Sequence, residues 1–176
     1  MSATGLDVFD KTVQTTNIWL DEMMADIGPD RRVAWHVMGA VLRCLRDRLP
    51  APLAAHLSAQ LPLLVRGAFY DQYRPDDGPL KIRDMDAFLQ HVAQGLADTR
   101  PVNARDATVA VFDVLSRHIP RGQCVKVRDA LPDELKTLWQ IDKGDGTPDK
   151  AAAGRAAQHA QEARTYQSRP DGQRRA

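Results

Sequence analysis

Hydrophobic residues recur at helical spacing along most of the chain, and their pattern is broadest between residues 33 and 49. On a helix of 3.6 residues per turn, the apolar positions of this stretch cover about 200°, against about 100° for an ordinary surface helix. The narrow polar remainder holds Arg32, His36, Arg43, Arg46 and Asp47. A helix with this pattern is packed on two or three sides, so we expect it at the centre of the fold.

Proline and glycine breaks divide residues 8–140 into eight predicted helices. The sequence therefore predicts an all-α fold. Six aromatic residues are expected to anchor its core: Trp19, Trp35, Phe69, Phe88, Phe112 and Trp139. The predicted division of the chain is a frayed N-terminus (1–7), a first helical repeat (8–73), a turn-rich linker (74–82), a second helical repeat (83–140) and a disordered tail (141–176).

The two predicted repeats resemble each other at an offset of 70 residues. Chance would give about two or three identities over such a window at average composition, and more are present: Ala34/Ala104, Ala40/Ala110, Val41/Val111, Leu45/Leu115, Pro50/Pro120, Leu61/Leu131 and Pro62/Pro132. We therefore predict a tandem duplication of a four-helix unit, with both copies packed as one compact eight-helix domain.

The tail differs in composition from the rest of the chain. Residues 142–176 contain no Val, Ile, Leu, Met, Phe or Trp, so nothing there can bury an apolar face. Residues 164–175 are mildly basic. This pattern is typical of a solvated, disordered segment, and an acidic partner is the alternative.

Charge and hydropathy narrow the class of protein. The formal net charge of +1 at pH 7 gives no electrostatic support for nucleic-acid binding. No apolar run approaches the length of a membrane-spanning helix, and residues 1–12 lack the basic and apolar regions of a secretory signal. We therefore expect a cytoplasmic protein without a membrane partner. Cys44 and Cys124 fall within helical patterns, which predicts buried, reduced thiols.

The sequence carries no strong catalytic, metal or cofactor motif, so it predicts no catalytic residue, no metal ligand and no cofactor. The least ordinary local chemistry is a group of arginines and tyrosines beside the linker. Arg66, Tyr70 and Arg74 recur every four residues on one predicted helix side, and Tyr73 is adjacent. These residue types are frequent at the centres of protein interfaces. The alternative is that Arg66 packs over a tyrosine or caps a helix end.

The polar stripe of the central stretch and the histidines are weaker candidates. Arg32, His36 and Arg43 share one helix side, which suits an anion, although a solvated face is the plainer interpretation. The remaining histidines are expected to be solvent-exposed or at a helix end: His56, His91, His118 and His159.

Two segments carry a family resemblance. QLPLLVRGAFYDQY (60–73) and ALPDELKTLW (130–139) share a Leu-Pro followed by aromatic residues, and they resemble the bacterial family known as domain of unknown function 2267. That family prefers Tyr where Phe69 stands and Trp where Tyr73 stands. The resemblance covers about residues 8–140. It implies an all-helical cytoplasmic bacterial protein and implies no activity.

Three hypotheses of function follow. The leading one is a non-enzymatic protein-interaction module that binds a protein partner or itself. The second is a small-ligand binder or enzyme with a pocket at the repeat junction, lined by Arg66, Tyr70 and Tyr73. The third is a regulatory contact of the basic tail end with nucleic acid.

Overall fold

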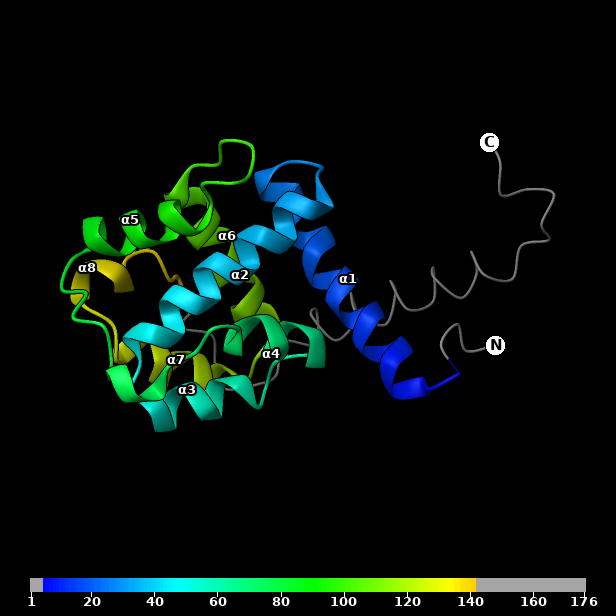
Figure 1. The fold of residues 1–176 in the computed structure, drawn as a ribbon, viewed down its shortest axis with the longest axis horizontal. Helices are drawn as coiled ribbons and strands as arrows, with labels where there is room; N and C mark the ends of the chain where they lie inside the picture. Colours follow the sequence, from blue (N-terminus) through cyan, green and yellow to red (C-terminus); the bar gives the residue numbers. More distant parts are fainter. Residues whose placement is uncertain (1–4, 142–176) are drawn as a thin grey trace. The chain divides into compact units, whose positions relative to one another are not determined.

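The computed structural model describes residues 5–141, and over that range its regular secondary structure is entirely helical (Figure 1). The α-helices are α1 (Asp7–Ile27), α2 (Arg31–Arg48), α3 (Ala51–Ser58), α4 (Leu63–Tyr70), α5 (Met85–Gly95), α6 (Ala104–His118), α7 (Arg121–Asp129) and α8 (Asp133–Lys136). One 3-10 turn, Pro75–Asp77, lies in the linker. The predicted all-α fold is confirmed. Ile141, the first residue of the predicted tail, packs against the core, and the rest of that tail (142–176) lies outside the described residues.

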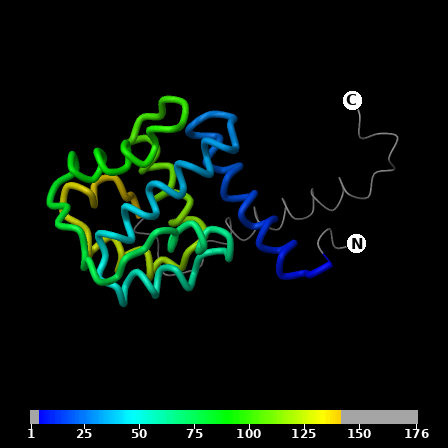
Figure 2. The backbone as a smooth tube through the Cα atoms, viewed as in Figure 1, coloured from blue at the N-terminus to red at the C-terminus, as the bar shows by residue number. Residues whose placement is uncertain are grey.

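Helix α2 lies at the centre of these helices, as its wide apolar face predicts. It packs against α1, α4, α5 and α6, and Figure 2 shows its path across the middle of the molecule. Val37, Val41 and Leu45 are completely buried. One position differs from the expectation: Arg46, assigned to the solvated stripe, is only 3% exposed.

Local chemistry fixes where the helices begin. The Asp30 carboxylate accepts hydrogen bonds from the N–H groups of Arg32 and Val33, at 2.9 and 3.2 Å, and so caps α2. Proline stands immediately before the first residue of α3, α4, α7 and α8. Helix α4 ends at Tyr70, before the predicted end of the first repeat at residue 73: the backbone leaves the helix at Asp71, with ψ of 128°, and Gln72 then adopts a positive φ of 56°.

The core contains five of the six aromatic anchors. Phe112 stacks on Trp139 with ring centroids 4.3 Å apart, and Phe88 lies tilted to Phe112 at 6.5 Å. Trp19 and Phe69 are also buried. Trp35 is only half-buried and packs against the core from its edge, so the expectation is met only in part.

The contacts between helices follow a recurring scheme. Helix α1 packs on α6 while α5 packs on α2; α2 packs on α6, and α3 packs on α7. Within residues 5–141, no helix combines the length and the apolar character needed to cross a bilayer.

Candidate functional site

The junction of α3 and α4 holds the arginine and tyrosine residues singled out by the sequence. Arg66 is half-buried, and its guanidinium donates to three backbone carbonyls. Nε lies 2.9 Å from the Ser58 oxygen, and Nη2 lies 3.2 Å from that of Ala59 and 3.1 Å from that of Leu61. The last carbonyls of a helix lack intrahelical donors and carry partial negative charge. Arg66 therefore caps the end of α3, which is the structural alternative considered for it.

Tyr70 reaches the same helix end and keeps an exposed ring. Its hydroxyl forms a hydrogen bond with Ser58 Oγ at 2.8 Å, with either oxygen able to donate. The ring lies edge-on to Phe69 at 5.2 Å and tilted to Tyr73 at 5.8 Å. Because Tyr70 remains 37% exposed, part of the aromatic surface is open to a partner.

Tyr73 lies against a buried arginine that the sequence interpretation missed. The Arg46 guanidinium stands 4.8 Å from the centre of the Tyr73 ring. Its Nη1 donates to the carbonyls of Phe69 at 2.5 Å and Asp71 at 2.7 Å, and its Nε donates to the Asp47 carboxylate at 2.7 Å. Arg46 thus ties the end of α4 to α2. From the sequence alone, an arginine beside the apolar face of a helix looks the same whether it is buried and hydrogen-bonded or exposed to solvent.

The outward side of α4 is apolar and open. Leu63 is 50% exposed, and Tyr70 lies on the same side two turns later. Between them, a Cβ placed on Gly67 would meet no heavy atom within 4 Å outside the local helix backbone. Arg66 borders this surface. The structure therefore groups Arg66, Tyr70 and Tyr73, while the side chain of Arg74 is exposed beyond them.

The apolar surface continues from α4 onto the first turns of α1. Leu64 is 43% exposed. Its N–H donates to Thr12 Oγ1 at 3.3 Å, which sets the start of α4 beside α1. Phe9 and Val13 on α1 are 46% and 44% exposed. We name the surface of Val8, Phe9, Val13, Leu63 and Leu64 the α1–α4 patch.

A second polar group joins α1 to the end of α6. Glu22 accepts from Arg117 at 3.2 Å and is hydrogen-bonded to His118 Nε2 at 3.0 Å. The imidazole stacks on Trp19 with centroids 5.1 Å apart. Burial raises the pKa of Glu22, but the hydrogen bonds and positive charges of His118 and Arg117 outweigh it, so the pKa lies below its ordinary value of 4.5. These contacts join α1 to the end of α6, and the polar atoms involved bond to one another.

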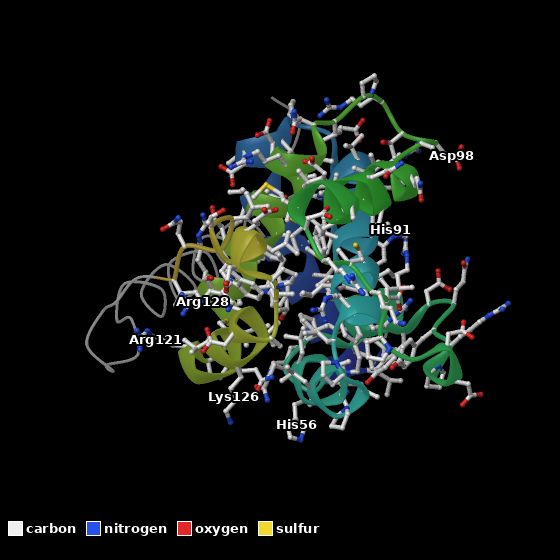
Figure 3. The ribbon with its side chains drawn as sticks, turned by 90° about the vertical axis from the view of Figure 1, so that its left-hand side faces the viewer. His56, His91, Asp98, Arg121, Lys126 and Arg128 are labelled. Carbon is white, nitrogen blue, oxygen red and sulfur yellow. The ribbon has the colours of Figure 1, made fainter. Side chains whose placement is uncertain are left out.

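The other sequence candidates lie apart from these groups. Figure 3 shows His56 on α3 and His91 on α5, and both are exposed as expected, whereas His159 lies outside the described residues. Arg32 and His36 are also exposed, and the guanidinium of Arg43 folds back over Gly39. No set of three or more His, Cys, Asp or Glu side chains in residues 5–141 is arranged to hold a metal ion.

The two thiols are buried and unpaired with each other, as predicted. Burial raises the pKa of Cys44 to about 12, with a further contribution from the negative charge of Asp47. Burial likewise raises the pKa of Cys124 to about 11. Thiols with such pKa values are almost entirely protonated at neutral pH and are poor nucleophiles.

Comparison with known proteins identifies a family without an assigned activity. No curated protein matches the chain at a significant level of similarity. A family model described as "Uncharacterized conserved protein (DUF2267)" matches residues 16–138, which covers α2 to α8 completely and the later part of α1. The chain therefore belongs to the DUF2267 family, as the Leu-Pro segments indicate.

Proposed function

We propose that this protein is a non-enzymatic protein-interaction module and that the outward side of α4 is its contact surface. The observation that carries the proposal is the open apolar strip of Leu63, Gly67 and Tyr70, bordered by Arg66. Tyrosine and arginine residues held rigidly by internal hydrogen bonds lose little entropy when a partner binds. Both residues are held in this way here, by the end of α3.

The chemistry of this surface supports binding better than catalysis. The guanidinium of Arg66 already donates to three carbonyls, and the hydroxyl of Tyr70 is paired with Ser58. Neither side chain is joined to a nucleophile and base within hydrogen-bonding distance of each other, which acyl or phosphoryl transfer would require. The exposed groups are apolar rings and methyl groups, which suit a protein surface.

Gly67 provides a direct test. A Cβ placed on Gly67 points into open space, so Gly67→Trp puts a large side chain onto the strip, and the helix gains stability when glycine is removed from its interior. Gly122 on α7 is the matched control, because a Cβ there also meets no atom within 4 Å. We expect Gly67→Trp to abolish partner binding and Gly122→Trp to leave it intact, with neither variant lowering the melting temperature. Tyr70→Ala should also abolish binding, at a modest cost in stability because its hydrogen bond to Ser58 is lost.

The partner can be identified with a photo-crosslinking amino acid placed at position 67 and, as the control, at position 122. In the native cytoplasm or its lysate, we expect a discrete crosslinked protein from position 67, absent from position 122 and lost with Tyr70→Ala. Identical crosslinking patterns from the two positions would contradict the proposal.

We also propose that the domain is a tandem duplication of a four-helix unit. In this proposal α1, α2, α3 and α4 correspond to α5, α6, α7 and α8. The contact between α1 and α6 then corresponds to the contact between α5 and α2, and the α2–α6 and α3–α7 contacts each join a helix to its own counterpart. This is the behaviour expected around a pseudo-two-fold axis. Pro62 and Pro132, at equivalent corners, have φ/ψ of −54°/150° and −56°/150°, which further supports the proposal.

A further inference from the structure

The α1–α4 patch holds five of the eight large hydrophobic residues that are substantially exposed in residues 5–141. Figures 1 and 2 show why: the first turns of α1 project past α4, so the rest of the domain covers only the later turns of α1. A group of neighbouring exposed apolar side chains on a helix that continues beyond its own domain indicates an interaction surface.

Helix α1 carries a heptad spacing over its full length. Apolar or small residues follow each other at alternating intervals of four and three, namely Phe9, Val13, Thr16, Leu20, Met23 and Ile27. The last four positions pack within the domain, with Thr16, Leu20 and Met23 at most 5% exposed. Phe9 and Val13 continue the same seam into solvent. An a/d seam is complementary to another helix, because its side chains insert between those of the partner helix.

The leucines at the start of α4 are not required by the corner that they occupy. The equivalent corner of the second half has Asp133 and Glu134 after its proline. Acidic residues suit the first turn of a helix because of its partial positive charge. Leu63 and Leu64 lack the favourable interaction that acidic side chains make with a helix start. They also remain 50% and 43% exposed, which favours a role in contact with a partner.

We propose that the α1–α4 patch is the interface of a symmetric homodimer, in which the projecting half of each α1 lies along Leu63 and Leu64 of a second copy. This inference rests on the proposed function, since it names a partner for the interaction module. A two-fold interface uses the same patch on both copies, so the projecting helix of each copy would meet the two leucines of the other. Residues 142–176 of the same chain are a poor occupant, because Tyr166 is their one large apolar or aromatic residue.

The size of the patch fits this assignment. With roughly 150–200 Å² for a fully exposed large side chain, the exposed fractions leave about 400 Å² of apolar surface on each copy. Two patches would bury about 800 Å² of apolar area. With apolar atoms supplying about 60% of an interface, the total is about 1,300 Å². That value lies at the lower end of the range of about 1,200–2,000 Å² for specific interfaces, so we expect a concentration-dependent dimer.

Sedimentation velocity of the full chain from about 5 to about 500 μM tests the inference, over the micromolar range expected of a modest interface. We expect the weight-average sedimentation coefficient to rise from the monomer value to the dimer value. The double variant Leu63→Asp, Leu64→Glu installs the residues of the second corner, and Phe9→Asp charges the projecting seam. Each should weaken association at least tenfold while melting temperature is maintained. Leu80→Asp is the matched control, because Leu80 is 37% exposed in the linker, and it should associate like wild type.

Two outcomes would overturn the inference. A monomer throughout the concentration range would show that no second copy covers the patch. A dimer that persists in both folded variants would place the interface elsewhere. Crosslinking from position 67 remains an independent test of the proposed function, because a different protein captured there would support an interaction module while the monomer result rejects the homodimer.

Discussion

Replacing Arg46 with Met should destabilise the domain by about 2–4 kcal/mol, although the sequence assigns this residue to the solvated side of α2. The side chain is 3% exposed, and its guanidinium serves the carbonyls of Phe69 and Asp71 and the carboxylate of Asp47. A hydrogen bond to a charged group contributes about 1.5–3 kcal/mol, so the two backbone bonds set an upper range of about 3–6 kcal/mol. The exposed Asp71 regains water in the variant, and Met retains part of the packing on Tyr73, which reduces the loss.

Urea unfolding at pH 7 and 25 °C, followed by far-UV circular dichroism, measures this loss directly. We expect a lower midpoint at unchanged m-value, because the surface exposed on unfolding hardly changes. Arg46→Lys should lie between wild type and Arg46→Met, since an ammonium keeps the charge but not the fork of donors. Arg43→Met on the same helix is the control: its guanidinium lies over Gly39, and we expect a change within about 0.5 kcal/mol. Equal stability of wild type and Arg46→Met would refute the argument that these bonds hold α4 on α2.

Further predictions concern the core, the thiols and an acidic side chain. Leu61→Ala and Leu131→Ala should each cost about 2–5 kcal/mol in urea unfolding, because both leucines are at most 3% exposed at helix corners; a loss below about 0.5 kcal/mol in both would contradict the duplicated-corner model. At pH 8, Cys44 and Cys124 should react with a disulfide reagent on the order of 100-fold more slowly than in the urea-unfolded chain, since their thiolate fractions are very small; equally fast labelling would show that they are not enclosed. Glu22→Gln should cost about 1 kcal/mol at neutral pH. Because the folded pKa of Glu22 is lowered, this stabilisation is present above 4.5 and is lost as pH falls through the folded value, so the two unfolding curves should converge in acid; a difference that is constant with pH would reject the ion-pair explanation.

The features that the sequence predicts well are those that depend on local chemistry. Asp30 caps α2 and is of a residue type that favours this position, and the prolines begin the short helices near the predicted breaks. The wide apolar face of α2 indicates several neighbours, and the structure places four helices around it. Hydrophobic periodicity is sufficient for these conclusions because it reports directly how many sides of a helix are buried.

The features that the sequence does not predict depend on where neighbouring helices stop. Arg46 is buried because α4 ends beside it and offers two carbonyls. The side chain of Leu64 is 43% exposed although its backbone N–H lies beside Thr12 of α1, and Trp35 is half-buried at the edge of the core. Periodicity gives the direction of a side chain around its own helix, but not whether another element covers it. The hydrophobic pattern does not fix the residue at which α3 ends, so the sequence leaves open whether Arg66 caps that helix.

The different lengths of α1 and α5 explain why the two Leu-Pro corners differ in chemistry. Helix α5 begins at Met85, and the Glu134 carboxylate accepts the N–H of Met85 at 3.0 Å, so the second corner supplies a cap for a helix start. Under the proposed duplication, Trp19, Leu20 and Met23 match Phe88, Leu89 and Val92 at an offset of 69 residues, so Met85 corresponds to Thr16. Thr16 lies inside α1 because that helix begins at Asp7. A residue inside a helix has its N–H paired within the helix and needs no cap. The residue at position 64 therefore does not have to accept a hydrogen bond from a helix start, as Glu134 does, and the fold tolerates an apolar residue there. If the two halves are copies of one unit, as we propose, the longer α1 removes a structural constraint at one corner and adds the exposed residue Phe9 in the same region. The apolar surfaces of α4 and α1 would then arise from a single difference between the two halves.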